Sequence, residues 1–536
     1  MSQEYDVIVI GSGIGGLATA SLLAQLKDQK VLVLEQHFKV GGFTHTFSRH
    51  NYKFDVGVHY IGEMQPGSRT RKLFDLVCGS GVNWQKMPEI FEKFVYPDFT
   101  IALPSSREAY EEVLCKQFPG ERQALHQYFK DISAVCKAVQ GRAAAGIMPS
   151  PIASAINAFN GTYQTKAIIS TKAYMDAQFK DDRLKAALVS QWGDYGLPPS
   201  LSAFAIHCLV ATHYLNGGYY PVGSADSIAT AIVPLIKRAG GDVLVNHKVE
   251  QIVVEGGIAR GVTVRTVQGE TIKYSARTVI SNAGLLPTYA QLLPESYRVK
   301  VDGYTDEVDS SSVTLYLGFK RSPAELGFRG ENHWLHAGYD HDASYAARNN
   351  PEGKPGFGYL SFASLKDASS PSHTGQVIAL ASAKPFKQWR DTAWKKRGSD
   401  YEHYKERITK SLLDMTESYY PGFGDLIDFA ELSTPLTVES FTGHPGGRIY
   451  GQPLTPAVMA ERSFKPDTHV KNLYLTGTDI LAPGVIGAFM GGVFCAARVM
   501  GATGLAEIML DSTKVAAAKN IAASVAPESD LVNSIK

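Results

Sequence analysis

Side chains that can exchange a proton near neutral pH stand in two short segments of the sequence. His59 and Tyr60 lie in FDVGVHYIGEM, and Asp194 and Tyr195 lie in QWGDYGLPPS. Such groups serve as general acids and bases when they are held beside a reacting atom. We take these four residues as the candidate catalytic groups, with His59 as the first choice. His207 and His213 are six positions apart, which is not the i, i+4 spacing of a helical ligand pair, so no metal site is predicted.

A glycine-rich turn near the start of the chain is the second chemical signal. An apolar run over residues 5–10 predicts a buried strand, and apolar residues at helical spacing follow the turn. The turn fits G-x-G-x-x-G through Gly11, Ser12, Gly13, Ile14, Gly15 and Gly16. This arrangement places the pyrophosphate of a dinucleotide against a helix N-terminus.

A second predicted strand, KVLVLEQ, ends at Glu35, nineteen positions after Gly16. A carboxylate at this place can accept both hydroxyls of an adenosine ribose and repels a 2′-phosphate. The unit therefore predicts an adenine dinucleotide site without a preference for NADP. NAD and FAD both remain compatible with it.

A further glycine pair, Gly41 and Gly42, follows the ribose-binding acid. The pair resembles the signature of the large flavoprotein family that includes amine oxidases and carotenoid desaturases. In that family it lies near the pyrophosphate and ribityl chain, so the resemblance favours FAD. The residues assigned to the same site around it are Gln36, His37, Phe43, Val58 and His59.

Three later segments are expected to return to the cofactor. The resemblance implies that the backbone of Val249 contacts the adenine edge. A returning strand ends in Asn282, Ala283 and Gly284, and the late turn with Gly477 and Asp479 leads to a small-residue helix with Gly487 and Ala488. Backbone N–H groups of that helix can reach the flavin, and Asp479 can bind ribityl hydroxyls. Aspartate is also favoured in turns for its own sake.

Composition limits the classes of function. The chain has 536 residues, more than one hydrophobic core usually serves, and its net charge of +1 argues against nucleic acid as a partner. Five scattered cysteines are expected to be buried thiols in a reducing compartment. The first strand begins near Tyr5 and no apolar run is long enough to cross a bilayer, so a cytoplasmic location is expected. The weakly apolar stretch of residues 146–163 is compatible with peripheral contact with a membrane.

The order of patterns predicts an α/β protein with a Rossmann-type FAD-binding domain, an inserted helical lobe and a mixed-sheet substrate domain. The expected divisions are residues 1–76, 216–290 and 451–511 for FAD binding, 77–215 for the helical lobe, 291–450 for the substrate domain and 512–536 for a flexible tail.

About 500 residues resemble the branch of the phytoene desaturase and carotenoid isomerase family that contains retinol saturase. The segments that carry the resemblance are residues 54–64, 191–224, 434–451 and 473–492, and the His59–Tyr60 pair separates this branch from ordinary desaturases. The resemblance implies FAD and a saturase, desaturase or isomerase acting on a carbon–carbon double bond. Its substrate would be a carotenoid, a retinoid or an unsaturated fatty acyl chain, and the chain is similar to bacterial-type members.

Two other functions share part of this pattern. An FAD amine oxidase has the same N-terminal signature, and a non-catalytic escort protein for prenylated or lipid partners has a similar fold. The complete glycine pair and the Asp479 turn argue against the escort reading. Because only one G-x-G-x-x-G unit is present, electrons are expected to exchange with oxygen, a quinone or a partner reductase rather than with NAD(P)H bound in a domain of its own.

Overall fold

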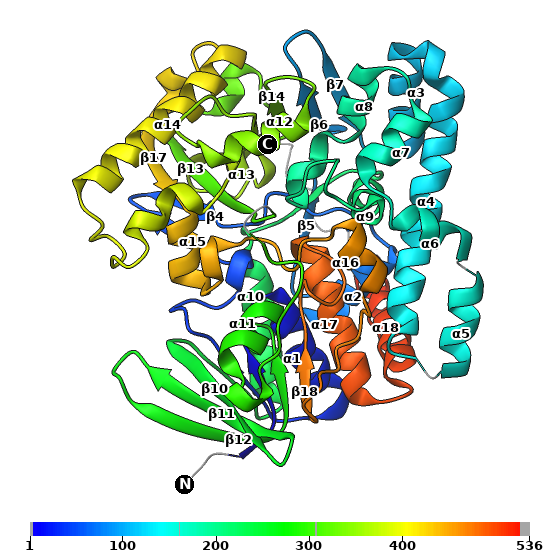
Figure 1. Ribbon diagram of the computed structural model, residues 1–536, viewed down its shortest axis with the longest axis vertical. Helices are drawn as coiled ribbons and strands as arrows, with labels where there is room; N and C mark the ends of the chain where they lie inside the picture. Colours follow the sequence, from blue (N-terminus) through cyan, green and yellow to red (C-terminus); the bar gives the residue numbers. More distant parts are fainter. Residues whose placement is uncertain (1–3, 149, 160, 306–307, 526–536) are drawn as a thin grey trace, which may run out of the picture.

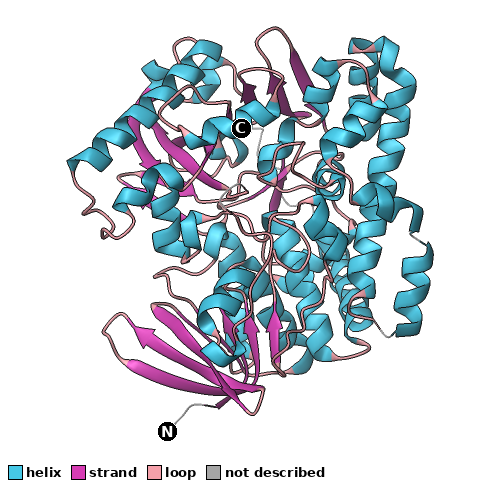
Figure 2. Ribbon diagram, in the orientation of Figure 1, coloured by secondary structure: helices cyan, strands magenta, loops and turns pink. Residues whose placement is uncertain are grey.

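A computed structural model describes residues 4–148, 150–159, 161–305 and 308–525. Two seven-stranded sheets organise the chain, one near each end of the long axis, and a column of helices runs along one side (Figures 1 and 2). Two-stranded ribbons β3 (Thr46–Arg49) with β4 (Tyr52–Asp55), and β5 (Trp84–Lys86) with β8 (Tyr219–Pro221), lie outside the large sheets. The α/β class is confirmed.

The first sheet has a parallel centre in the order β18-β12-β1-β2-β9, extended by an antiparallel meander of β10, β11 and β12. Its strands are β1 (Glu4–Ile10), β2 (Val31–Leu34), β9 (Asp242–Leu244), β10 (His247–Glu255), β11 (Ile258–Thr266), β12 (Thr271–Ser281) and β18 (Leu473–Leu475). The four residues of β2 are all buried, as is typical of a parallel strand covered on both faces. Three separate stretches of the chain thus build one sheet.

Three helices cover this sheet. Helix α1 (Ile14–Lys27) packs against both α10 (Asp226–Arg238) and α17 (Gly484–Met500). Small residues permit the close contact with α17, because a Cβ on Gly492 would lie 2.5 Å from the backbone oxygen of Gly15. The N-termini of α1 and α17 are thereby held side by side.

The second sheet is mixed, in the order β17-β13-β16-β15-β14-β6-β7, with β14 and β6 parallel. Its strands are β6 (Ile90–Val95), β7 (Thr100–Pro104), β13 (Ser311–Phe319), β14 (Asn332–His336), β15 (Phe357–Ser361), β16 (His373–Ala381) and β17 (Ile427–Ser433). Strands β5, β6 and β7 correct the expectation that 77–215 forms a helical lobe throughout. Charged residues interrupt β5 and β6, and β7 has only five residues, so the sequence lacks the clean apolar alternation that marks a strand.

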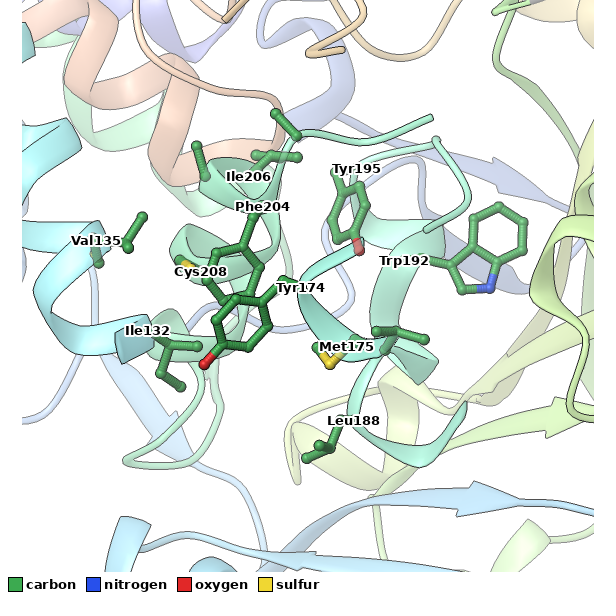
Figure 3. Close-up of a cluster of buried hydrophobic side chains, with 14 of the residues drawn as sticks. Ile132, Val135, Tyr174, Met175, Leu188, Trp192, Tyr195, Phe204, Ile206 and Cys208 are labelled. Carbon is green, nitrogen blue, oxygen red and sulfur yellow. The ribbon is translucent and has the colours of Figure 1, made fainter. Parts of the chain in front are cut away.

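The helical part begins at α3 (Arg107–Gln117) and continues through α4 (Arg122–Ala145), with Pro119 and Gly120 in the short turn between them. Further helices are α5 (Ser150–Phe159), α6 (Gly161–Ala167), α7 (Thr171–Gln178), α8 (Asp182–Leu188) and α9 (Phe204–His213). A buried aromatic and aliphatic cluster joins α3, α4 and α6–α9, and in it the rings of Tyr174 and Phe204 stack at 3.8 Å (Figure 3).

The C-terminal segment differs from the flexible tail expected from residue 512. Helix α18 (Gly504–Val525) continues through most of it, and Ser512 is buried. Alanine and lysine are strong helix formers, which explains why this composition gives a helix. Residues 526–536 lie outside the described part.

All five cysteines are buried free thiols, as the sequence analysis expects. Within the described ranges, no helix has both the length and the apolar character needed to cross a membrane. On the surface, Ile152 of α5 and Tyr163 of α6 are exposed.

Candidate functional site

A cavity of about 1820 Å³ extends from the glycine-rich turn into the space between the two sheets. The cofactor candidates on its wall are Gly11, Gly13, Ile14, Gly15, Glu35, Gln36, His37, Gly42, Phe43, His59, Val249, Asn282, Ala283, Gly487 and Ala488. Ligand pockets usually measure about 300 to 1000 Å³, so this cavity has room for two ligands.

Two helix N-termini open on the cavity. Helix α1 follows Gly13 and α17 follows Pro483, and no side chain caps either helix. The first backbone N–H groups of a helix have no partner within the helix, and the helix dipole makes this end attractive to anions. The pair of ends suits a ligand that carries phosphates.

Glu35 is held at the end of β2 by a small network. Its carboxylate accepts hydrogen bonds from the backbone N–H of Ser12 at 2.9 Å, the hydroxyl of Ser12 at 2.6 Å and the backbone N–H of His37 at 2.8 Å. The hydroxyl of Ser12 in turn accepts from the backbone of Gly41 at 3.1 Å. Ser12 and Gly41, which do not line the cavity, thus position the acid that does.

The glycines bring distant backbone segments into contact. A Cβ on Gly42 would lie 2.9 Å from Cα of Gly13, and a Cβ on Gly15 would lie 2.5 Å from Cα of Gly477. The side chain of Asn282 fills the remaining space, since its amide would lie 2.8 Å from a Cβ on Gly13. Because these segments are in contact, a residue larger than glycine does not fit at Gly13, Gly15 or Gly42.

Asp479 lies behind this surface. Its carboxylate accepts from the backbone N–H of Leu285 at 2.6 Å and of Gln452 at 2.7 Å, and it does not line the cavity. Asp479 thereby holds its own turn against the loops that contain Leu285 and Gln452. The candidates Gly16, Val58, Gly284 and Gly477 also lie off the cavity wall.

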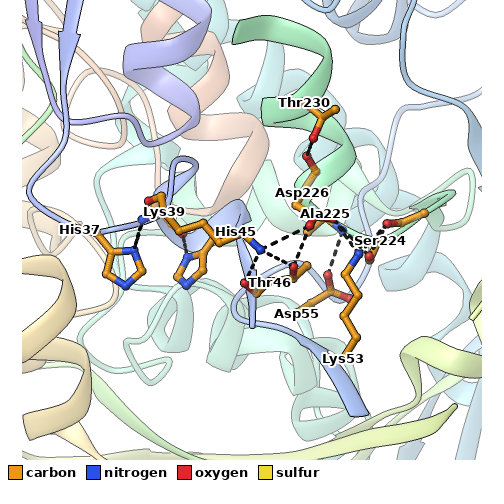
Figure 4. A network of polar contacts seen from close by, with 12 residues as sticks. His37, Lys39, His45, Thr46, Lys53, Asp55, Ser224, Ala225, Asp226 and Thr230 are labelled. Carbon is orange, nitrogen blue, oxygen red and sulfur yellow. Dashed lines mark hydrogen bonds and ion pairs between the residues drawn. The ribbon is translucent and has the colours of Figure 1, made fainter. Parts of the chain in front are cut away.

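A polar network anchors the segment that leads from the glycine pair to His59 (Figure 4). Asp226, in the first turn of α10, accepts from Thr46 at 2.9 Å and from Lys53 at 3.0 Å. Asp55 is buried and accepts from the backbone of Ala225 at 2.9 Å. Burial raises the pKa of Asp55 to about 6, and the Tyr220 hydroxyl donates to it.

His59 lines the cavity on the far side of this segment. Burial, together with the charge of Lys366, lowers the pKa of its imidazole to about 3, so the ring is neutral near pH 7. The Lys366 ammonium group donates to the backbone oxygen of His59 at 2.8 Å and to Asn332 and Ser361. Burial lowers the pKa of Lys366 to about 7.

Tyr60 and Asp194 also line the cavity, and they meet a third group that sequence reasoning missed. The Tyr60 hydroxyl lies 2.9 Å from Oε1 of Glu92 and 3.1 Å from Oδ2 of Asp194. Burial raises the pKa of Asp194 to about 7, and burial with the charge of Asp194 raises the pKa of Glu92 to about 8. Two carboxyl groups that favour protonation thus flank one hydroxyl.

Tyr195 takes a different place from Asp194. Its side chain is buried beside Trp192 in the cluster of Figure 3 and does not line the cavity. His207 is bonded to Tyr128 at 2.9 Å, and His213 accepts from the backbone of Gly62 at 2.8 Å. Among the described residues no group of three or more potential metal ligands is found.

Apolar side chains of α9, β15 and β16 line one part of the cavity, called the apolar chamber below. The side chains that line this part are Ile206, Leu209, Val210, Phe357, Ile378 and Leu380. Side chains of α4 and α18 also line the cavity, among them Lys137, Gln140 and Met509. Because apolar walls favour an apolar ligand, the apolar chamber suits a hydrocarbon chain.

Fold and site together define a dinucleotide-binding enzyme whose nucleotide cavity continues into an apolar chamber. Residues 9–76 match the family described as NAD(P)-binding Rossmann-like domain. The chain is 32% identical to the all-trans-retinol 13,14-reductase of Danio rerio, over 93% of this chain and 86% of that protein. It is 24% identical to the chloroplastic prolycopene isomerase of Daucus carota, over 94% and 82%.

The chain belongs to the retinol saturase and carotenoid isomerase family, as the sequence resemblance predicts. Cyclohexylamine oxidase from Brevibacterium oxydans has a similar structure, with a TM-score of 0.57 and 14% identity over 97% of this chain and 100% of that one. That likeness confirms an amine oxidase-type fold and goes no further.

Proposed function

We propose that this protein is an FAD-dependent oxidoreductase that acts on a carbon–carbon double bond of a long apolar substrate. The observation that carries the proposal is the continuity of the cavity, from the glycine-rich turn past His59, Tyr60 and Asp194 into the apolar chamber. Two ligands that share this cavity would meet at the acid–base residues.

The residues present fit FAD. The uncapped N-termini of α1 and α17 suit the phosphates and the flavin, Glu35 suits the adenosine ribose, and Val249 lies on the wall of the same end. Close approach of Gly42 to Gly13 leaves backbone, rather than side chains, beside the pyrophosphate position. Bound flavin supplies hydride transfer to or from carbon.

The protein's own part is to position the substrate, exclude water and handle the proton. The apolar chamber orients a polyene or acyl chain and keeps water from the double bond. Asp194 lies on the cavity wall, and its pKa, raised to about 7, lets it give or take the proton near neutral pH. The neutral imidazole of His59 shapes the pocket next to it.

The relatives support unsaturated isoprenoids as the substrate class, since one is a retinol reductase and another an isomerase of prolycopene. The amine oxidase alternative rests on the shared N-terminal signature and on fold likeness. We place the protein in the cytoplasm with apolar contact to a membrane through α5 and α6, and its electron partner is oxygen, a quinone or a reductase.

Mass spectrometry of lipid extracts from cells with and without the protein tests the reaction. A product that differs by two hydrogens indicates saturation or desaturation, and an unchanged mass with altered retention indicates isomerisation. Flavin content of the purified protein tests the cofactor. If extracts are identical and the protein binds no flavin, the proposal is wrong.

The electron partner is tested separately, by adding NADPH to the oxidised flavoprotein without oxygen. We expect no rapid loss of flavin absorbance, because Glu35 repels a 2′-phosphate and one nucleotide site is already taken by FAD. Stoichiometric bleaching within the mixing time would contradict this expectation.

A further inference from the structure

Glu92 is a buried acid that the proposed function does not use. It stands in β6 with its side chain fully buried and off the cavity wall. A carboxyl group in such a place costs free energy unless hydrogen bonds satisfy it or it stays protonated. The groups that contact Glu92 therefore indicate its role.

Three donors converge on Glu92. The indole N–H of Trp334 donates to Oε1 at 2.6 Å, and the amide of Gln191 donates to Oε2 at 2.6 Å. The third contact is the hydroxyl of Tyr60, at 2.9 Å from Oε1. Because all three groups favour the carboxylate while burial favours the acid, Glu92 can exist in either form.

The contact with Tyr60 continues to Asp194. A tyrosine hydroxyl has one proton to donate and lone pairs to accept another. If the Tyr60 hydroxyl donates its proton to one of the two carboxyl groups, the other carboxyl group can form a hydrogen bond with the Tyr60 oxygen only by donating a proton to it. The chain Glu92–Tyr60–Asp194 therefore leads from a dry interior to the cavity wall without a gap.

We propose that Glu92, Tyr60 and Asp194 form a proton relay, in which Glu92 restores the proton that Asp194 gives to a carbon of the substrate. This inference rests on the proposed function. In the reductive direction, one carbon of the double bond receives a hydride from reduced flavin, which is thereby oxidised. The other carbon receives the proton of Asp194 as the π bond breaks.

The rest of the step moves charge away from the substrate. The proton of Tyr60 passes to the Asp194 carboxylate, and the proton of Glu92 passes to the Tyr60 oxygen. The negative charge ends on Glu92, where Trp334, Gln191 and Tyr60 stabilise it, instead of facing an apolar chain. In the oxidative direction the same steps run backward.

The first test needs no substrate. Infrared difference spectra recorded across a pH titration report protonated carboxyl groups. In the purified flavoprotein at pH 7 we expect a protonated carboxyl signal that is reduced in Glu92→Gln and shifted in Tyr60→Phe. An unchanged signal in both variants would overturn the relay, whatever the substrate is.

The second test uses all-trans-retinol and a poly-cis carotenoid as probes, with chemically reduced flavoprotein and no oxygen. We expect Glu92→Gln and Tyr60→Phe each to slow product formation at least tenfold, with a larger solvent isotope effect. The double variant should lose no more than either single one, because both break the same chain. If the rate losses of the two single variants multiply in the double variant and the solvent isotope effect is unchanged, Glu92 and Tyr60 have a structural role instead.

Glu89→Gln is the matched control, because Glu89 precedes the same strand with an exposed carboxylate that is off the cavity wall. We expect it to behave as the unaltered protein. If the unaltered protein converts neither probe, the proposed function fails for these substrates and the infrared titration still decides the relay. If it converts a probe and Glu92→Gln does so equally fast, the relay alone is wrong.

Discussion

The ammonium group of Lys366 lies 2.8 Å from the backbone carbonyl oxygen of His59. The lysine is buried at the end of α13 (Ala363–Lys366), so a side chain of the second sheet domain fixes the backbone of the nucleotide-binding segment. The contact links the two parts of the chain at the place where their ligands would meet.

Replacement of this lysine should disturb His59. In Lys366→Met the oxygens of His59, Asn332 and Ser361 lose their donor, which costs about 1 to 3 kcal/mol for each group that stays unsatisfied. We expect a lower free energy of unfolding in urea and slower turnover with normal flavin content. Lys354→Met, at an exposed position, serves as the control and should change neither quantity.

Loss of Glu35 should weaken cofactor binding. Hydrogen bonds to charged groups contribute about 1.5 to 3 kcal/mol, so Glu35→Ala should lower flavin affinity about tenfold to a hundredfold. Fluorescence titration of the apoprotein with FAD measures this. Glu255→Ala, on an exposed end of the same sheet, should bind FAD as before. Equal affinity in both variants would mean that Glu35 does not bind the ribose.

A methyl group at Gly15 should force two backbones apart. The added Cβ would lie 2.5 Å from Cα of Gly477 and 2.9 Å from the backbone oxygen of Ala488. Overpacking of this kind costs about 1 to 3 kcal/mol, so Gly15→Ala should unfold at lower temperature and release its flavin. Gly120→Ala meets no atom within 4 Å and should be neutral in the same thermal scan.

The pH dependence of stability should reveal the buried acid. The pKa of Glu92 is raised to about 8, so the folded state binds more protons than the unfolded state between about pH 4.5 and 8. Its contribution to the free energy of unfolding therefore falls as pH rises through this window. Glu92→Gln removes the fall, and we expect its stability relative to the unaltered protein to increase by roughly 2 to 4 kcal/mol from pH 5 to pH 9.

That comparison also controls for other titrating groups. The pKa of His59 is lowered to about 3 and that of Lys366 to about 7, and both contributions make stability rise with pH in their own windows. The contribution of His59 is present in both proteins and cancels in the difference. The charge of Glu92 raises the pKa of Lys366, so the substitution lowers the pKa of Lys366 further and adds to the rise of relative stability with pH. A difference that stays flat across the titration would contradict a protonated Glu92.

The nucleotide-binding end could be predicted because its determinants are local. The strand, turn, helix and Glu35 occur within 35 residues, and each has a distinct pattern. The second strand and the late helix at Gly484 also followed from apolar runs and small residues. Where a short stretch of sequence fixes both geometry and chemistry, sequence alone suffices.

Glu92 could not be predicted for the opposite reason. In the segment IFEKFV its carboxylate is next to Lys93, a pattern typical of a solvent-facing edge. Its burial comes from Trp334, which is 242 positions away, and from Gln191, 99 positions away. Lys366 was missed in the same way, since its contact with His59 spans 307 positions.

The first sheet has a consequence for how the protein is made. Its β12 is flanked by β1 from the start of the chain and by β18, which ends at Leu475. Pairings between such distant segments close large loops and form slowly. During synthesis, the nucleotide-binding site cannot be completed until almost the whole chain has left the ribosome. Until then the edge of β12 is an open template for mispairing, so cofactor supply should govern how much protein reaches the folded state.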